Sequence, residues 1–163
     1  MGLDITAFSN LSPAAKRDEE NLHVYTNPDF HKRADKLKAG EYKYDKALDV
    51  AAFSYSGYNN WREQLAQFAG YPAVERSMYG TEQKVFRHDQ GAWNSEEGPF
   101  HELIHFSDCE GVIGPVTCEK LAGDFYMYQQ LANATQDKYF IERYNALRKG
   151  FELGAQNGCV QFH

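Results

Sequence analysis

The chain has 163 residues, 42% of them hydrophobic and 25% charged, and a formal net charge of -6. This length and composition predict one soluble domain, residues 1–163, that can bury a proper core and is not disordered. The acidic balance provides no general attraction to a phosphate backbone, so duplex nucleic acid is not an expected partner.

The N-terminal stretch MGLDITAFSNLS has no basic segment followed by a long apolar run. We therefore expect neither a secretory signal nor a membrane span, and predict a cytoplasmic protein without a membrane partner. Its three cysteines, Cys109, Cys118 and Cys159, are widely spaced and contain no C-x-x-C pair. They are expected to be reduced and buried or half-buried, rather than disulfide-bonded or bound to zinc.

The first third of the chain predicts short strands joined by polar connections. Residues 29–40 are mostly charged and are expected to form an excursion on the surface. In chain order, the expected elements are a strand at Leu3–Phe8, a polar helical turn at Ala14–Asn21, and strands at Leu22–Tyr25, Tyr42–Tyr44 and Val50–Tyr55.

The spacing of four large apolar residues predicts a helix at Gly57–Ala69, ended by Gly70 and Pro72. Its core face would contain Tyr58, Trp61, Leu65 and Phe68, and its wet face Arg62, Glu63 and Gln67. The region 71–97 carries the weakest pattern, and its one predicted element is a strand at Gln83–Arg87.

Proline suits the first turn of a helix, which predicts a short helix at Pro99–Ser107 and a longer one at Pro115–Ala134. Asp137 is expected to cap the last helix, which would run to about Gly158 and pair with the helix before it. The final strand, Cys159–Phe162, is expected to pair with the first strand. The sequence thus predicts an α+β fold, in which a small, mostly antiparallel sheet packs against three or four helices.

His101-Glu102-Leu103-Ile104-His105 fits the H-E-x-x-H pattern. On a helix, His101 and His105 would lie one turn apart and could hold a zinc ion, with Glu102 as general base and Glu119 as third ligand. The longer pattern with a third histidine fails, because Gly111 stands at that position. Two alternatives remain open: these residues form an exposed polar helix face, or they line a pocket that binds a ligand without metal.

The Ser54–Arg62 block, SYSGYNNWR, is the second candidate for a site. A glycine that opens a helix presents free N–H groups to an anion, while tyrosine rings and the Arg62 fork suit a nucleotide. The alternative is that Tyr58 and Trp61 are simply core. A core role does not explain the residues that lie off the apolar stripe, which are Tyr55, Ser56, Asn59 and Arg62.

An acidic turn, Asp108-Cys109-Glu110-Gly111, follows the H-E-x-x-H segment. Such a turn binds a cation or a ribose hydroxyl, or simply faces water. The sequence contains no Walker loop, no G-x-G-x-x-G, no G-x-S-x-G and no EF-hand pattern. The common nucleotide-hydrolase, dehydrogenase, esterase and calcium-binding functions are therefore not expected.

Four blocks are the most distinctive parts of the chain: Met1–Phe8, Ser54–Arg62, Glu102–Gly114 and Val160–His163. Together they resemble a family of small uncharacterised proteins encoded by phages, prophages and bacteria. In that family the third block typically reads E-L-I-N-F. The resemblance therefore implies that Glu102, Asp108 and Glu110, rather than the two histidines, are the important residues of this block. A phage setting implies a role against host defence, either by binding a partner or by sequestering a nucleotide signal.

The leading hypothesis is a non-enzymatic, phage-type protein that binds a small polar or nucleotide-like molecule and needs no cofactor. Alternatives are a zinc-dependent hydrolase and a protein–protein inhibitor that binds a host protein through its acidic surface. A homo-oligomer is compatible with each. The expected ligand-binding residues are Tyr55, Ser56, Gly57, Tyr58, Asn59, Arg62, Glu102, His105, Asp108 and Glu110.

Overall fold

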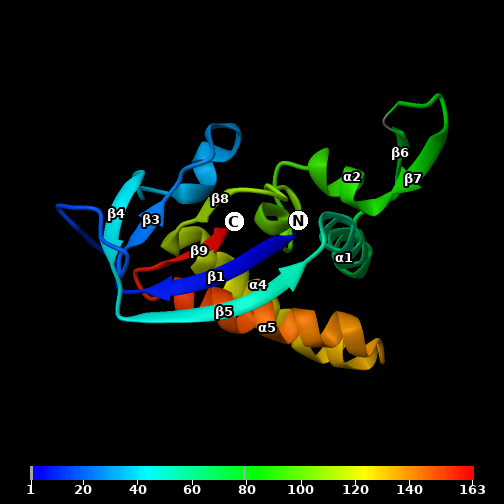
Figure 1. Ribbon diagram of the computed structural model, residues 1–163. Coiled ribbons are helices and arrows are strands. Elements are labelled where there is room, and N and C mark those ends of the chain that lie inside the picture. Colours follow the sequence, from blue (N-terminus) through cyan, green and yellow to red (C-terminus); the bar gives the residue numbers. More distant parts are fainter. Residues whose placement is uncertain (1, 79) are drawn as a thin grey trace.

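A four-stranded antiparallel sheet with strand order β5-β1-β9-β8 runs through the centre of the computed structural model (Figure 1). The structure describes residues 2–78 and 80–163; Met1, which opens the first distinctive block, and Tyr79 lie outside the described residues. The sheet is formed by β5 (Lys46–Phe53), β1 (Leu3–Ser9), β9 (Cys159–Phe162) and β8 (Gly111–Ile113).

The two ends of the chain meet as neighbouring strands in this sheet. Ile5 of β1 lies opposite Phe162 of β9, and Ala7 lies opposite Val160. All four side chains are fully buried or nearly so. The predicted pairing of the terminal strands, and with it the α+β fold, is confirmed.

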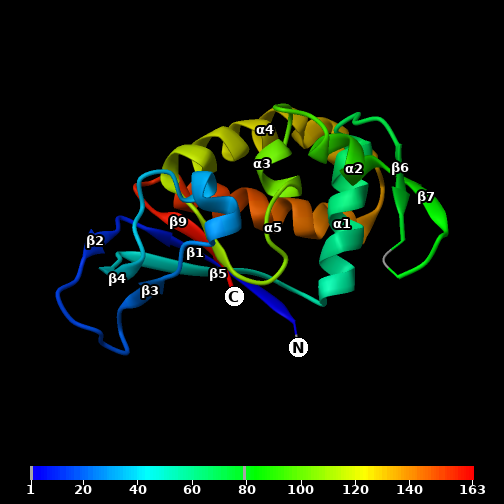
Figure 2. The same ribbon diagram turned by 90° about the horizontal axis from the view of Figure 1, so that it is seen from above.

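Two long helices, α4 (Pro115–Ala134) and α5 (Lys138–Gly154), pack side by side against the sheet (Figure 2). Both start where the sequence predicts. Asp137 caps α5, because its Oδ1 accepts a hydrogen bond of 3.0 Å from the Phe140 amide. The Tyr144 hydroxyl donates to the Phe125 carbonyl oxygen at 2.6 Å and so ties the two helices together. None of the helices in the described residues has the length and apolar character that a membrane span requires.

A second, three-stranded sheet corrects the prediction of a helical turn at Ala14–Asn21. β2 (Ser12–Pro13) and β3 (Leu22–Val24) both pair with β4 (Gly40–Lys43), and the Ala14 amide donates to Glu41 O at 2.8 Å. A short polar stretch does not nucleate a helix without an apolar face to bury, and residues 15–21 form bends and turns between the two strands. The charged excursion contains the 3-10 helix η1 (Pro28–Ala34), whose last residue, Ala34, is buried.

The region 71–97 forms a hairpin and a short helix that project from the body (Figure 1). The hairpin consists of β6 (Val74–Ser77) and β7 (Lys84–Arg87), the second of which matches the predicted strand. The helix α2 (His88–Trp93) was not predicted. α1 (Tyr55–Phe68) and α3 (His101–Ile104) lie between this region and the sheet.

Gly150 is where α5 approaches β5 most tightly. A Cβ atom at Gly150 would lie 2.6 Å from Val50 Cγ2, closer than real Cβ atoms come to their neighbours. Gly123 in α4 provides a matched contrast, since none of the described residues comes within 4 Å of a Cβ placed there. Both glycines lie inside long helices, so a change to alanine alters helix propensity equally at the two sites and packing at only one.

We expect Gly123→Ala to raise the free energy of unfolding by about 0.5–1 kcal/mol through helix propensity. Gly150→Ala should lower it by roughly 1–3 kcal/mol through overpacking. Urea unfolding of both variants measures the difference. In the double variant Gly150→Ala, Val50→Ala, the clash disappears and the two changes should be non-additive. Equal effects at the two glycines would contradict the close approach of α5 to β5.

Candidate functional site

Arg62 lies at the centre of the candidate site, and it is buried rather than on the wet face of α1. Only 7% of the residue is exposed. Its Nη1 donates to the carbonyl oxygens of Ile104, at 3.3 Å, and Phe106, while Nη2 donates to Asn59 Oδ1. The Tyr58 ring lies against the guanidinium, with its centroid 4.6 Å from Cζ. The guanidinium thus joins α1 to the segment that follows α3.

The start of α1 differs from the prediction. The helix begins at Tyr55, two residues early, because Ser54 is its N-cap and its Oγ accepts a 3.0 Å hydrogen bond from the Gly57 amide. This amide was expected to be free for an anion, and it is already satisfied. Tyr55 and Ser56 are exposed at this end of the helix.

The predicted helix Pro99–Ser107 is reduced to the single turn of α3. Phe100 has a left-handed backbone with φ of 56°, and His105 leaves the helical region with ψ of 61°. The Phe100 amide is satisfied by Asp124 Oδ2 at 2.8 Å. The carbonyl oxygens of Ile104 and Phe106 lie at the C-terminal end of α3, where backbone acceptors have no intrahelical partner, and both accept from Arg62.

The turn after α3 brings Asp108 to the same place. Asn59 Nδ2 donates to Asp108 Oδ2 at 3.2 Å, and Arg62 Nη2 lies 3.9 Å from that oxygen. Ser107 Oγ accepts from the Cys109 and Glu110 amides at 3.2 and 3.1 Å and so fixes the turn. The two sequence blocks, 49 residues apart at this contact, therefore meet through Asn59, Arg62 and Asp108.

A second charged cluster orients α2 beside α1. Arg87 donates to both carboxylate oxygens of Asp89, at 3.0 and 2.7 Å. The Glu63 carboxylate accepts from the amides of His88 and Asp89, at 2.9 and 2.8 Å, and so caps the first turn of α2. Burial favours the neutral form of Asp89, but the hydrogen bonds and charge of Arg87 outweigh it and hold the pKa of Asp89 below its usual value.

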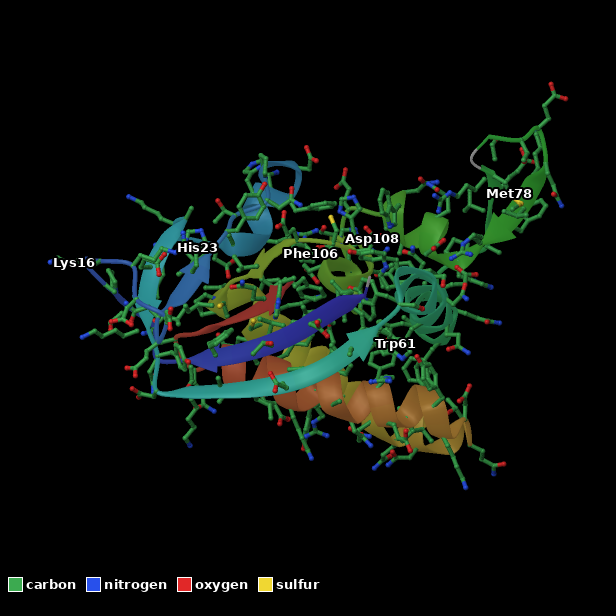
Figure 3. The ribbon with its side chains drawn as sticks, in the orientation of Figure 1. Lys16, His23, Trp61, Met78, Phe106 and Asp108 are labelled. Atoms are coloured by element: carbon green, nitrogen blue, oxygen red, sulfur yellow. The ribbon has the colours of Figure 1, made fainter. Side chains whose placement is uncertain are left out.

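These elements enclose a cleft of about 790 Å³, which we call the Arg62 cleft. Figure 3 labels residues from two of its sides, Phe106 and Asp108 on the loop after α3 and Met78 on the hairpin. One wall is held in place, because Trp93 Nε1 donates to Ile104 O at 3.3 Å and its ring packs edge-on against His105. The lining residues are Asn27, Asp29, Phe30, Asn59, Arg62, Glu63, Arg76, Ser77, Met78, Val85, Phe86, Arg87, Asp89, Trp93, Phe106, Ser107, Asp108 and Cys109.

Other residues predicted for the site lie elsewhere. Glu102 Oε2 pairs with Lys120 Nζ at 2.6 Å, and Lys120 also pairs with Asp124. Glu110 is exposed, and its carbonyl oxygen accepts from Asn27 Nδ2 at 2.9 Å. Those outside the lining of the Arg62 cleft are Tyr55, Ser56, Gly57, Tyr58, Glu102, His105 and Glu110.

The residues of the zinc alternative are not arranged as a three-donor set. His101 Nε2 lies 2.8 Å from the Ser95 carbonyl oxygen, which only accepts, so this nitrogen carries a proton and has no free lone pair. Glu102 is engaged with Lys120, and Glu119 is exposed on α4. Within residues 2–78 and 80–163 there is no group of three His, Cys, Asp or Glu side chains placed to hold a metal ion.

All three cysteines are free thiols, two of them buried as expected. Burial raises the pKa of the Cys159 thiol to about 12. Cys109 is exposed, which corrects the expectation that it is at least half-buried, and it lines the Arg62 cleft.

Several lining residues were missed because they belong to the region 71–97. The alternation in Lys84–Arg87 predicts the strand but does not identify its lining residues, since Val85 and Arg87 on one face and Phe86 on the other all line the cleft. Trp93, 46% exposed, gave no periodic signal because α2 is too short to show one.

No protein-family model, curated protein or solved structure matches this chain. The resemblance to phage-encoded proteins stays a prediction for the same reason. The geometry of the Arg62 cleft is therefore the basis for the function proposed below.

Asp89→Asn tests the charged cluster through its pH dependence. A pKa lowered by folding means that the carboxylate stabilises the fold above the ordinary pKa of an aspartate, about 4. This stabilisation is lost as the pH falls through the pKa that Asp89 has in the folded protein. At pH 7 we expect the variant to lose about 1–3 kcal/mol of unfolding free energy, the value of a charge-assisted hydrogen bond. Denaturant unfolding from pH 7 to pH 2.5 measures this, and a difference that stays constant at low pH would contradict it.

Proposed function

We propose that this protein binds a small polar, nucleotide-like molecule in the Arg62 cleft. The observation that carries the proposal is the convergence of Asn59, Arg62 and Asp108 on a cleft that also exposes aromatic residues, among them Phe86 and Trp93. Its volume, about 790 Å³, falls in the range of small-molecule sites. The proposed activity is ligand binding without catalysis of a reaction.

The apolar side of the cleft suits a planar ring. Phe86 and Trp93 are large aromatic residues that remain 70% and 46% exposed, although burial of either would be favourable. Stacking a base on such a ring contributes about 1–3 kcal/mol. Because the hydrogen bond from Trp93 Nε1 already fixes the indole, little entropy is lost when a ligand stacks on it.

The polar side of the cleft suits hydrogen-bond donors on the ligand. The Asp108 side chain is 43% exposed, and Oδ2 is held by Asn59 and Arg62. A carboxylate fixed in this way accepts from a base amino group or a ribose hydroxyl without first being ordered. Arg76, which is exposed at the hairpin, adds a donor for an anionic group. In the phage setting that the sequence suggests, such a protein would sequester a nucleotide signal of host defence.

Thermal-shift titration with nucleosides and with mono- and cyclic nucleotides tests the proposal. Binding should raise the melting temperature with ligand concentration by mass action. Phe86→Ala should weaken the best ligand about tenfold, because one stacking surface is lost. Tyr126→Ala is the matched control: Tyr126 is also 70% exposed, but it lies on α4 outside the cleft lining, so affinity should not change. No shift with any compound at millimolar concentration would contradict the proposal.

A further inference from the structure

A smaller pocket of about 200 Å³ adjoins the Arg62 cleft, and Asp29 and Phe30 line both. The Phe30 ring lies between them, since it packs against His105 on one side and Phe106 on the other, with centroids 5.8 and 5.4 Å away. Four of the six residues that line the smaller pocket are basic. We call it the basic pocket, lined by Asp29, Phe30, His31, Lys32, Arg33 and His105.

Arg33 carries a charge that the fold does not neutralise. The side chain is half-buried, and its buried Nε has no hydrogen-bond partner among residues 2–78 and 80–163. In the part of the chain that the structure describes, no carboxylate lies within 4 Å of Arg33 or Lys32. Burial lowers the pKa of Arg33, and this effect outweighs the opposing influence of the Glu102 and Asp35 charges. A half-buried guanidinium of this kind is costly unless a partner is supplied.

The acidic groups nearest to Arg33 are committed to other partners. Asp35 accepts from the Val116 and Thr117 amides, at 2.9 and 3.0 Å, and from the Thr117 hydroxyl, so it caps α4. Glu102 is held by Lys120 at 2.6 Å. Turning toward Arg33 would cost Asp35 its hydrogen bonds at the start of α4 and Glu102 its ion pair with Lys120.

The surroundings of His105 are positively charged as well. Burial lowers the pKa of this imidazole, and so do the charges of Arg33 on η1, His101 on α3 and Arg62 on α1. A neutral His105 still offers one N–H donor to a ligand. The pocket thus combines the half-buried Arg33, the exposed Lys32, two histidines and one acid, Asp29, in a space suited to a small anion.

We propose that the basic pocket binds a phosphate-class anion, with Arg33 and Lys32 as its charged donors. A guanidinium matches the geometry of phosphate oxygens, and charge-assisted hydrogen bonds are about twice as strong as neutral ones. The phosphate can be inorganic phosphate, or the phosphate group of a nucleotide whose ring occupies the Arg62 cleft beyond Phe30. The proposal goes beyond the proposed function, since it holds whether or not the cleft accepts a ring.

Calorimetric titration with inorganic phosphate at constant ionic strength tests the pocket by itself. We expect one phosphate to bind per chain. Arg33→Gln should weaken binding at least about tenfold, because it removes a charge-assisted hydrogen bond to the phosphate. Lys32→Gln should also weaken binding severalfold; because Lys32 is exposed, this variant keeps the test valid if Arg33→Gln fails to fold. Lys36→Gln is the control, since it removes the same charge from the same segment outside the pocket.

Absence of phosphate binding, or equal weakening by Lys36→Gln and Lys32→Gln, would overturn the proposal. Titrating adenosine against adenosine monophosphate separates it from the proposed function. Tighter binding of the monophosphate, lost in Arg33→Gln, identifies the nucleotide phosphate as the ligand. Binding of phosphate without any nucleoside supports the basic pocket and contradicts the nucleotide function. Equal binding of both compounds supports the function and overturns the phosphate site.

Discussion

The guanidinium of Arg62 is the interaction on which the candidate site depends. A buried guanidinium must satisfy its donors inside the protein, and here they bind the carbonyl oxygens of Ile104 and Phe106. Both carbonyls lie at the C-terminal end of α3, where a helix leaves its last acceptors without an intrahelical partner. The end of α3 and the burial of Arg62 are therefore complementary, because the arginine supplies the donors that these acceptors need.

The hydrogen bonds around Arg62 also position the walls of the Arg62 cleft. Ile104 O also accepts from Trp93 Nε1, so the same carbonyl fixes the indole of α2 and the guanidinium of α1. Glu63, the neighbour of Arg62, caps α2 from the other side. Asp108 is positioned by Asn59, three residues before Arg62 and one turn away on the same helix. A single helix thus places the loop after α3, the helix α2 and the carboxylate that faces the cleft.

The fold was more predictable from the sequence than the site was. Local patterns suffice to predict strands β1 and β9 and helices α1, α4 and α5, because each carries its own apolar pattern and the helices also carry start or stop signals such as Pro115 and Asp137. The cleft instead depends on contacts between residues far apart in sequence, such as Arg62 with Phe106 and Glu63 with His88. Arg62 was placed on the wet face because apolar periodicity counts only apolar residues. A buried arginine that finds carbonyl acceptors leaves no trace in that pattern.

Hydrogen–deuterium exchange of Arg62→Met, compared with the wild-type protein, tests the central role of this arginine most directly. Methionine keeps apolar bulk but has no donors, so the account predicts faster exchange in residues 105–110 and at Trp93, with α4 and α5 unchanged. Arg143→Met is the control. Arg143 packs on the Phe53 ring, so its substitution leaves the hydrogen bonds to the loop carbonyls in place. Unchanged exchange in residues 105–110, or an equal increase throughout the protein, would contradict the account.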